Sequence, residues 1–301
     1  MGNAFESGRF VRGWGIGCLV LACVCAVLYF VAGAFHATPV MLFLKPVPAL
    51  AGAAFLFVVA VVCERTGALG AAPDGRAPSR FVVLAAGAFV LYAVGDFLLC
   101  FRTRTSYVPL AVGMVFFFVG HCCMVLSCYF YGSTLSPSVP QEADKEGKEE
   151  EEGDATNPGT PSLWKRLKGA PRVVGAAALA ASEVAVTVVT VAVLHARNPA
   201  FSPWMLLSGA AYLLVYPVLA YYAVRALPRG AALATLCTGT AVYLASDLLL
   251  GGCLVLGTFP FAGALVMLSY WAALALFYAA VLLSLRHRVT TVRVPLLPSS
   301  R

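Results

Sequence analysis

The chain has 301 residues, of which 60% are hydrophobic and 12% are charged, and its mean hydropathy is +0.85. Soluble domains carry about 25% charged residues, so this composition excludes an ordinary soluble protein and predicts a polytopic membrane protein without a sizeable soluble domain. The formal charge of +7 lies mostly in loops and termini, so it indicates orientation in a membrane rather than binding of nucleic acid.

The predicted elements are all helical. About 20 consecutive apolar residues span a bilayer, and eight segments meet this requirement. We therefore predict an all-α transmembrane bundle with eight spans. They are residues 13–35, 41–63, 80–101, 108–131, 171–194, 202–224, 231–255 and 260–285. The first run is too long for the core of a signal peptide and lacks a convincing cleavage site, so we expect it to remain as a helix.

One long polar stretch, residues 132–169, separates the fourth span from the fifth. It contains the acidic run KEGKEEEE at 145–152 and is rich in Pro, Ser and Thr. Such a composition buries too little apolar surface to fold, which predicts a disordered acidic linker. The chain then divides into an N-terminal four-helix half (1–131), the linker, and a C-terminal four-helix half with a short basic tail (170–301).

The distribution of lysine and arginine predicts the orientation. With eight spans both termini share one side, and 17 of the 21 Lys and Arg residues fall on that side. Three, Arg102, Arg104 and Arg197, fall on the other, and Lys45 stands apart at the start of the second span. By the positive-inside rule both termini and the linker face the cytoplasm. We expect a multi-pass protein of the endoplasmic reticulum or another endomembrane.

Two aspartates lie inside apolar helices in matching frames. Residues 92–99 read YAVGDFLL and residues 243–250 read YLASDLLL, so Asp96 and Asp247 each follow a tyrosine (Tyr92 and Tyr243) by four positions. A carboxylate in hydrocarbon costs roughly 2.5–3.5 kcal/mol on insertion scales, so an intramembrane aspartate indicates a functional site. The competing interpretation is that each aspartate only hydrogen-bonds a neighbouring helix.

Other polar residues fall at a similar depth. His121 and Tyr270 lie on the spans that follow the two aspartates, and Lys45 lies near the non-cytoplasmic face. Asp96 is about five residues, or roughly 8 Å, below that face. The segment around Lys45 reads KPVPA and that around Tyr216 reads YPVLA, which extends the internal similarity. We predict two parallel repeats of four helices that converge on one pocket.

The ten cysteines do not predict a metal site. Nearly all lie within apolar helices, and none shows the paired CxxC spacing of zinc sites. His121 is the only membrane-embedded histidine, which argues against a histidine-rich zinc centre. The chain also lacks a GxSxG elbow and a phosphate-binding Gly-rich loop.

The pattern KP at 45–46, GDFLL at 95–99, GH at 120–121, SDLL at 246–249 and MLSY at 267–270 resembles the YhhN family of eight-span membrane proteins. The resemblance covers nearly the whole membrane part, from about Lys45 to Leu285, but not the acidic linker. Characterised animal members of that family are lysoplasmalogenases. The resemblance implies cleavage of the vinyl ether of a lysoplasmalogen, which yields a fatty aldehyde and glycerophosphoethanolamine or glycerophosphocholine. It also implies that the aspartates and the histidine are functional residues.

The residues suit that chemistry. Vinyl ether hydrolysis needs a carboxylic acid that keeps its proton near neutral pH and a second group that stabilises the cation and activates water. We predict Asp96 and Asp247 as this pair, with either one as the acid, and His121 as a water-orienting or proton-shuttling residue. Tyr270, Tyr92, Tyr243 and Tyr216 are the further candidate substrate-binding residues, and Lys45 is the candidate ligand of the headgroup phosphate. No cofactor or metal is needed, and the partners are the lysophospholipid and membrane lipids.

Two alternatives from other classes remain. Repeated halves with polar residues at mid-membrane are also typical of transporters, although only Pro46 and Pro217 approach the paired helix interruptions of that class. The other alternative is a non-catalytic membrane adaptor that acts through its acidic linker.

Overall fold

The computed structural model describes residues 2–35, 38–69, 79–101, 108–133, 203–228 and 230–293, together with part of the stretch 178–197. This part of the chain is all-helical. Its labelled helices are α1 (Gly2–Ala34), α2 (Thr38–Leu44), α3 (Val47–Thr66), α4 (Arg80–Leu99), α5 (Val108–Ser133), α7 (Pro203–Leu213), α8 (Val215–Ala226), α9 (Ala231–Leu256) and α10 (Ala262–Arg293).

Six stretches of these helices are long and apolar enough to cross a membrane. They are Gly13–Ala34, Pro39–Thr66, Arg80–Leu99, Val108–Ser133, Ala231–Leu254 and Ala262–Thr290. Of the other two predicted spans, 171–194 is described only in part and overlaps a shorter apolar helix at Val184–Arg197, and 202–224 corresponds to the two shorter helices α7 and α8. The all-helical, multi-pass character is therefore confirmed, and the count of eight stays a prediction.

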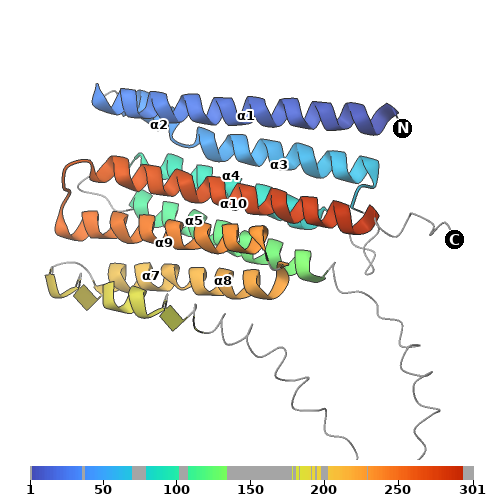
Figure 1. The fold of residues 1–301 in the computed structure, drawn as a ribbon. Helices are drawn as coiled ribbons and strands as arrows, with labels where there is room; N and C mark the ends of the chain where they lie inside the picture. The colour runs from blue at the N-terminus through green and yellow to red at the C-terminus, as the bar shows by residue number, and fades with distance from the viewer. Residues whose placement is uncertain are drawn as a thin grey trace, which may run out of the picture.

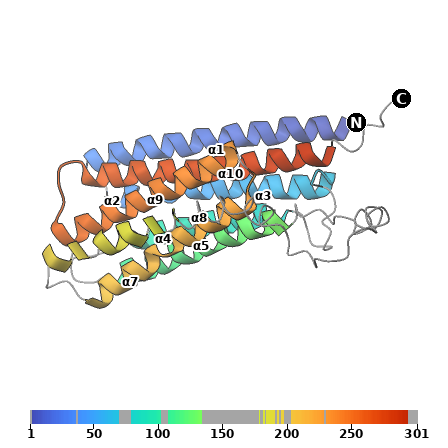
Figure 2. The same cartoon turned by 60° about the horizontal axis from the view of Figure 1, so that its bottom comes forward.

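The helices run side by side in one elongated bundle (Figures 1 and 2). Helix α4 packs on α5 and α3, α9 packs on α10 and α8, and α5 meets α8 across the middle. Helix α1 lies on one edge against α3, and its outer face carries exposed apolar side chains such as Leu19, Val20 and Val27. Such a face suits contact with lipid, where apolar groups need no burial against protein. The start of α1 and the end of α10 lie at the same end of the bundle (Figure 1).

In each half of the chain, one predicted span is divided into two helices near a proline. Helix α2 ends at Leu44 and α3 begins at Val47, directly after Pro46, whereas α7 ends at Leu213 and α8 begins two residues before Pro217. A proline has no N–H to donate, and its ring clashes with the carbonyl four residues earlier, so a helix is interrupted there. The sequence indicated paired helix interruptions only weakly, through Pro46 and Pro217. The structure has an interruption at both places.

Candidate functional site

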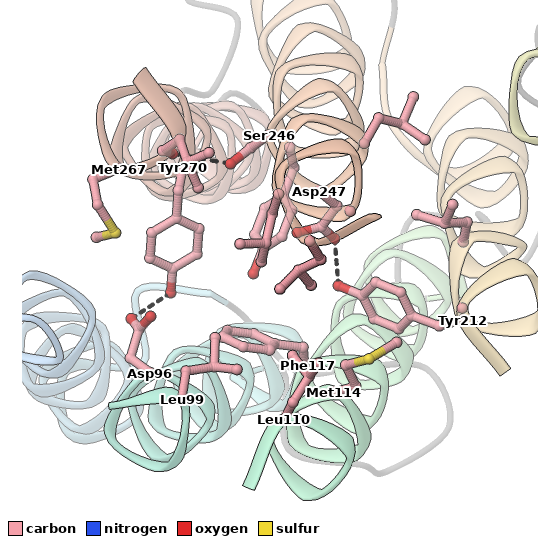
Figure 3. A pocket seen from close by; sticks show the side chains of 18 of the residues that line it. Asp96, Leu99, Leu110, Met114, Phe117, Tyr212, Ser246, Asp247, Met267 and Tyr270 are labelled. Carbon is pink, nitrogen blue, oxygen red and sulfur yellow. Dashed lines mark hydrogen bonds between the residues drawn. The ribbon is translucent and has the colours of Figure 1, made fainter. Parts of the chain in front are cut away.

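A cavity of about 150 Å³ lies inside the bundle, between the two halves. Most of its wall is apolar, and its described polar groups are few and come from α4, α7, α9, α10, the α2–α3 break and Thr190. The side chains that give it this apolar character include Leu99, Leu110, Met114, Phe117, Leu213, Leu250 and Leu254. Figure 3 shows Asp96 with Tyr270 on one side of the cavity and Asp247 with Tyr212 on the other.

Asp96 is held by two donors that come from outside its own helix. It lies on α4 and is 1% exposed. The Tyr270 hydroxyl on α10 donates to its Oδ2 atom at 2.7 Å, and the Lys45 ammonium lies 3.3 Å from its Oδ1 atom. Both carboxylate oxygens are therefore occupied, and the negative charge has an adjacent cation in a low-dielectric surrounding.

Asp247 is held differently. It lies on α9, and the Tyr212 hydroxyl donates to its Oδ2 atom at 2.6 Å, while the Tyr216 hydroxyl donates to the same atom. The two phenol oxygens lie 3.0 Å apart. Asp247 is less buried than Asp96, and its side chain lines the cavity (Figure 3). Its neighbours are therefore neutral hydroxyls, in contrast to the ammonium beside Asp96.

The helix breaks supply these donors in corresponding ways. Lys45 immediately precedes Pro46 and reaches Asp96, and Tyr216 immediately precedes Pro217 and reaches Asp247. Tyr212 lies just before the α7–α8 break, one helical turn from Tyr216. Interrupting a helix changes the direction of the side chains around the break, so in each half a polar side chain turns toward the aspartate of the same half.

His121 lies behind the cavity rather than on its wall. It is completely buried on α5, and its Nδ1 atom is 2.8 Å from the carbonyl oxygen of Phe117. Because a carbonyl only accepts, Nδ1 carries the proton and Nε2 is the bare acceptor. Nε2 has no hydrogen-bond partner among the described residues. The rings of Tyr243, Tyr216 and Tyr92 surround it, with centroids 4.6, 4.7 and 5.0 Å away.

The structure brings together most, but not all, of the predicted site residues. Lys45, Asp96, Tyr243, Asp247 and Tyr270 line the cavity. Tyr216 reaches Asp247 without lining the cavity, and His121 and Tyr92 pack against each other outside its lining.

Sequence reasoning missed Tyr212 and Ser246 as site residues. Tyr212 donates to Asp247, and Ser246 lines the cavity while its hydroxyl donates to the Val266 carbonyl at 3.0 Å. The available signal was the spacing of Tyr212 and Tyr216, which at i and i+4 lie on one face of a helix.

The described residues contain no group of three His, Cys, Asp or Glu side chains arranged to hold a metal ion. The described lining of the cavity offers two carboxyls, one ammonium, several phenols and the hydroxyl residues Ser246 and Thr190 in an apolar surrounding.

Comparisons with known proteins return nothing for this chain: no family model matches it, and neither a curated protein nor a solved structure is significantly similar to it.

Proposed function

We propose that the protein is a membrane-embedded hydrolase that cleaves the vinyl ether bond of lysoplasmalogens, in line with its resemblance to the YhhN family. One observation carries the proposal: Asp96 and Asp247 line the same apolar cavity, and each accepts hydrogen bonds from side chains of other helices. Aspartates that served only to join helices would need no common cavity. Two carboxyls facing one space are the arrangement that acid–base catalysis requires.

The size and lining of the cavity fit part of a single-chain lipid. Its volume of about 150 Å³ is below the roughly 300–1,000 Å³ of pockets that enclose a drug-sized ligand. We therefore expect the cavity to hold the vinyl ether and the adjacent carbons of the lipid. The rest of the lipid's hydrocarbon chain would extend between helices or into the bilayer. The apolar wall excludes bulk water, which favours a reaction whose intermediate is a cation stabilised by fixed charges.

The reaction proceeds in three balanced steps. One carboxylic acid gives its proton to the β-carbon of the vinyl ether, and the electron pair of the double bond forms the new C–H bond. An oxygen lone pair then completes the oxocarbenium ion. Water adds to the oxocarbenium carbon, which is bonded to the ether oxygen, and loses a proton to the other carboxylate. The resulting hemiacetal loses its hydroxyl proton to the first carboxylate and receives a proton on its ether oxygen from the second carboxyl. Its C–O bond then breaks, which releases the fatty aldehyde and glycerophosphoethanolamine or glycerophosphocholine.

The ion pair between Lys45 and Asp96 limits the predicted role of Lys45 as a ligand of the headgroup phosphate. Its ammonium lies 3.3 Å from Asp96, so a headgroup phosphate would have to share it with the carboxylate. We therefore propose Lys45 first as a partner of Asp96, with phosphate contact as its second role. His121 has no place on the cavity wall, so the steps above need no contribution from it.

The test is a substrate panel combined with variants of both aspartates. Purified protein in detergent is incubated with lysoplasmalogens and with ordinary lysophospholipids, and free aldehyde is measured. We expect aldehyde from the lysoplasmalogens alone, and a loss of at least about 100-fold in kcat for Asp96→Asn and for Asp247→Asn, because general acid–base catalysis contributes about 10²–10⁴-fold.

Ser284→Ala provides a matched control. Ser284 is buried on α10, and its hydroxyl bonds within its own helix to the Ala280 carbonyl, away from the cavity lining. Its activity should equal that of the wild type. Near-normal activity of both aspartate variants would contradict the proposal, and the aspartates would then be helix-packing groups.

A transporter is the second candidate, and the paired proline breaks favour it. Interrupted helices in corresponding positions of two halves, with polar residues at the break, are the pattern of transporter binding sites. An intramembrane Lys–Asp pair also suits coupling to protons. The two functions separate in detergent, where a hydrolase releases aldehyde and a transporter produces no chemical change.

We further propose two parallel four-helix repeats with both termini in the cytoplasm of an endomembrane. The corresponding positions of Lys45 and Tyr216, each directly before a proline and in contact with the aspartate of its own half, support the repeat, and the excess of Lys and Arg on one side supports the orientation. A C-terminal tag on sealed microsomes should be open to protease added outside. Protection of the tag until detergent is added would reverse the orientation.

A further inference from the structure

We propose that the two carboxyls rest in different protonation states: Asp96 is ionised and Asp247 carries a proton, so Asp247 is the proton donor. Lys45 is the positioning residue that imposes this difference. The assignment of acid and base rests on the proposed function, whereas the protonation states do not and can be measured without any substrate.

The contacts of Asp96 favour its ionised form. Oδ1 faces the Lys45 ammonium and Oδ2 accepts from the Tyr270 hydroxyl. An ionised carboxylate only accepts, and two donors on its two oxygens satisfy it, whereas a proton on Oδ1 would face the ammonium, which can only donate. The side chains of Lys45 and Asp96 are 12% and 2% exposed, so neither charge is solvated and each depends on the other.

The contacts of Asp247 have the opposite character. Tyr212 and Tyr216 both donate to Oδ2, and Oδ1 receives no hydrogen bond from the residues that the structure describes. A protonated carboxyl fits this pattern, because its carbonyl oxygen accepts twice while the hydroxyl on Oδ1 remains free to donate into the cavity.

The charges around Asp247 also favour its neutral form. Among the described residues, the titratable side chains around Asp247 are the phenols Tyr212 from α7, Tyr216 from α8, Tyr243 from its own helix and Tyr92 from α4, together with the Asp96 carboxyl across the cavity. The lining from α5 consists of Leu110, Met114 and Phe117. The described residues include one lysine on the cavity wall, Lys45, and it is paired with Asp96. A second negative charge would lack a cation and would be repelled by the first across the cavity.

This asymmetry assigns the roles of the two aspartates in the three steps. The proton on Asp247 goes to the β-carbon, and Asp96 takes a proton from the water that adds to the oxocarbenium ion. In the collapse of the hemiacetal, Asp96 returns that proton to the leaving ether oxygen while Asp247 removes the proton of the hemiacetal hydroxyl. Both residues then regain their starting states, so the cycle closes without an external acid or base.

Infrared spectroscopy of the purified protein at neutral pH tests the assignment. A protonated carboxyl has a C=O stretching band that shifts on exchange into D₂O, and a carboxylate does not. We expect a difference spectrum between wild type and Asp247→Asn to contain this band, and the same spectrum for Asp96→Asn to lack it. Lys45→Met should add a second protonated carboxyl band because Asp96 loses its cation, and Lys45→Arg should abolish that second band again.

The kcat for aldehyde release is measured for the lysine variants as a second test. Lys45→Met should lower kcat at least about tenfold, because Asp96 without its cation is protonated and no longer acts as a base. This loss is a part of the roughly 10²–10⁴-fold that acid–base catalysis contributes. Lys45→Arg should recover most of this loss. Ser284→Ala should change neither spectrum nor kcat, and gel filtration verifies the folding of every variant.

Three results overturn the inference. A protonated band that disappears in Asp96→Asn and persists in Asp247→Asn reverses the assignment. A band absent from both difference spectra means that both groups are ionised, and an unchanged spectrum in Lys45→Met removes the role of the lysine. If the bands follow the expectation while wild-type protein releases no aldehyde, the proposed function fails and the protonation assignment stands.

Discussion

At the residue scale, the surroundings of His121 are those of a packing residue with one unused acceptor. Its Nε2 atom is buried without a partner among the described residues, and a lost or missing hydrogen bond of this kind costs about 1–3 kcal/mol. The three tyrosine rings nearby contact its faces and edges, and aromatic pairs of this geometry stabilise by about 0.5–1.5 kcal/mol beyond area burial. A phenylalanine would keep these contacts and remove the unused acceptor, which offsets the loss of the Nδ1 hydrogen bond to the Phe117 carbonyl.

We therefore predict that His121→Phe keeps aldehyde release within about tenfold of wild type, equivalent to about 1.4 kcal/mol, and leaves thermal stability unchanged or slightly raised. His121→Ala, in contrast, should lose about 3 kcal/mol of stability or more, because it opens a cavity in a packed aromatic cluster. Activity per folded molecule and thermal unfolding in detergent measure the two effects. A His121→Phe variant as inactive as Asp96→Asn would mean that the imidazole transfers the proton.

Single-residue chemistry was the part of the site that the sequence predicted best. A carboxylate among apolar residues stands out at any position, which is why Asp96 and Asp247 were found. Their donors were harder, because a tyrosine in an apolar helix more often packs than binds, and nothing in the local pattern separates Tyr212 from Tyr278. The Lys45–Asp96 pair joins residues 51 positions apart, so only the folded arrangement of α2, α3 and α4 reveals it.

At the element scale, the helix pair α4–α5 depends on glycine at its closest approach. A Cβ atom added to Gly120 would lie 2.6 Å from a ring carbon of Tyr92 and 3.2 Å from the Ala88 carbonyl oxygen. Close approach of small residues is the usual means by which membrane helices associate, since the apolar bilayer provides no hydrophobic drive between them. Gly87, on α4, has nothing within 4 Å of such an atom and serves as a comparison.

Gly120→Ala should destabilise the bundle by about 1–3 kcal/mol, because the added methyl group forces Tyr92 or the α4 backbone to move. Gly87→Ala should be neutral or stabilising by up to about 1 kcal/mol, because alanine has the higher helix propensity. Denaturant unfolding of the two purified variants compares them directly. Equal stability of both would mean that α4 and α5 are less closely packed than the structure has them.

The breaks between α2 and α3 and between α7 and α8 could not be predicted from hydropathy. Hydropathy predicted continuous spans at 41–63 and 202–224, because apolar content is insensitive to a break of one or two residues. Pro46 and Pro217 were visible, but prolines near the end of a membrane helix are often tolerated without interruption. Whether the chain continues as one helix depends on what satisfies the freed carbonyl groups, which involves neighbouring helices and lies beyond the local sequence.

At the scale of the whole molecule, the described part of the candidate site is built from helices and from the break between two of them. Its described lining comes from α4, α5, α7, α9 and α10, from Lys45 at the α2–α3 break, and from Thr190. The acidic stretch 136–161, within the predicted linker, lies outside the described residues. If the helices carry the catalytic groups, its charge is separable from catalysis, which distinguishes an enzyme from an adaptor that acts through the linker.

Replacing residues 136–161 with a neutral Gly/Ser sequence of the same length should leave kcat for aldehyde release within about twofold of wild type. Equal length keeps the connection between the halves unchanged, and even halving a flexible connection changes its closure free energy by only about 0.6 kcal/mol. The comparison uses purified protein in detergent, with Asp247→Asn in the same background as the inactive reference. A loss of activity approaching that of the reference would place the linker in the catalytic cycle and would contradict a site confined to the helices.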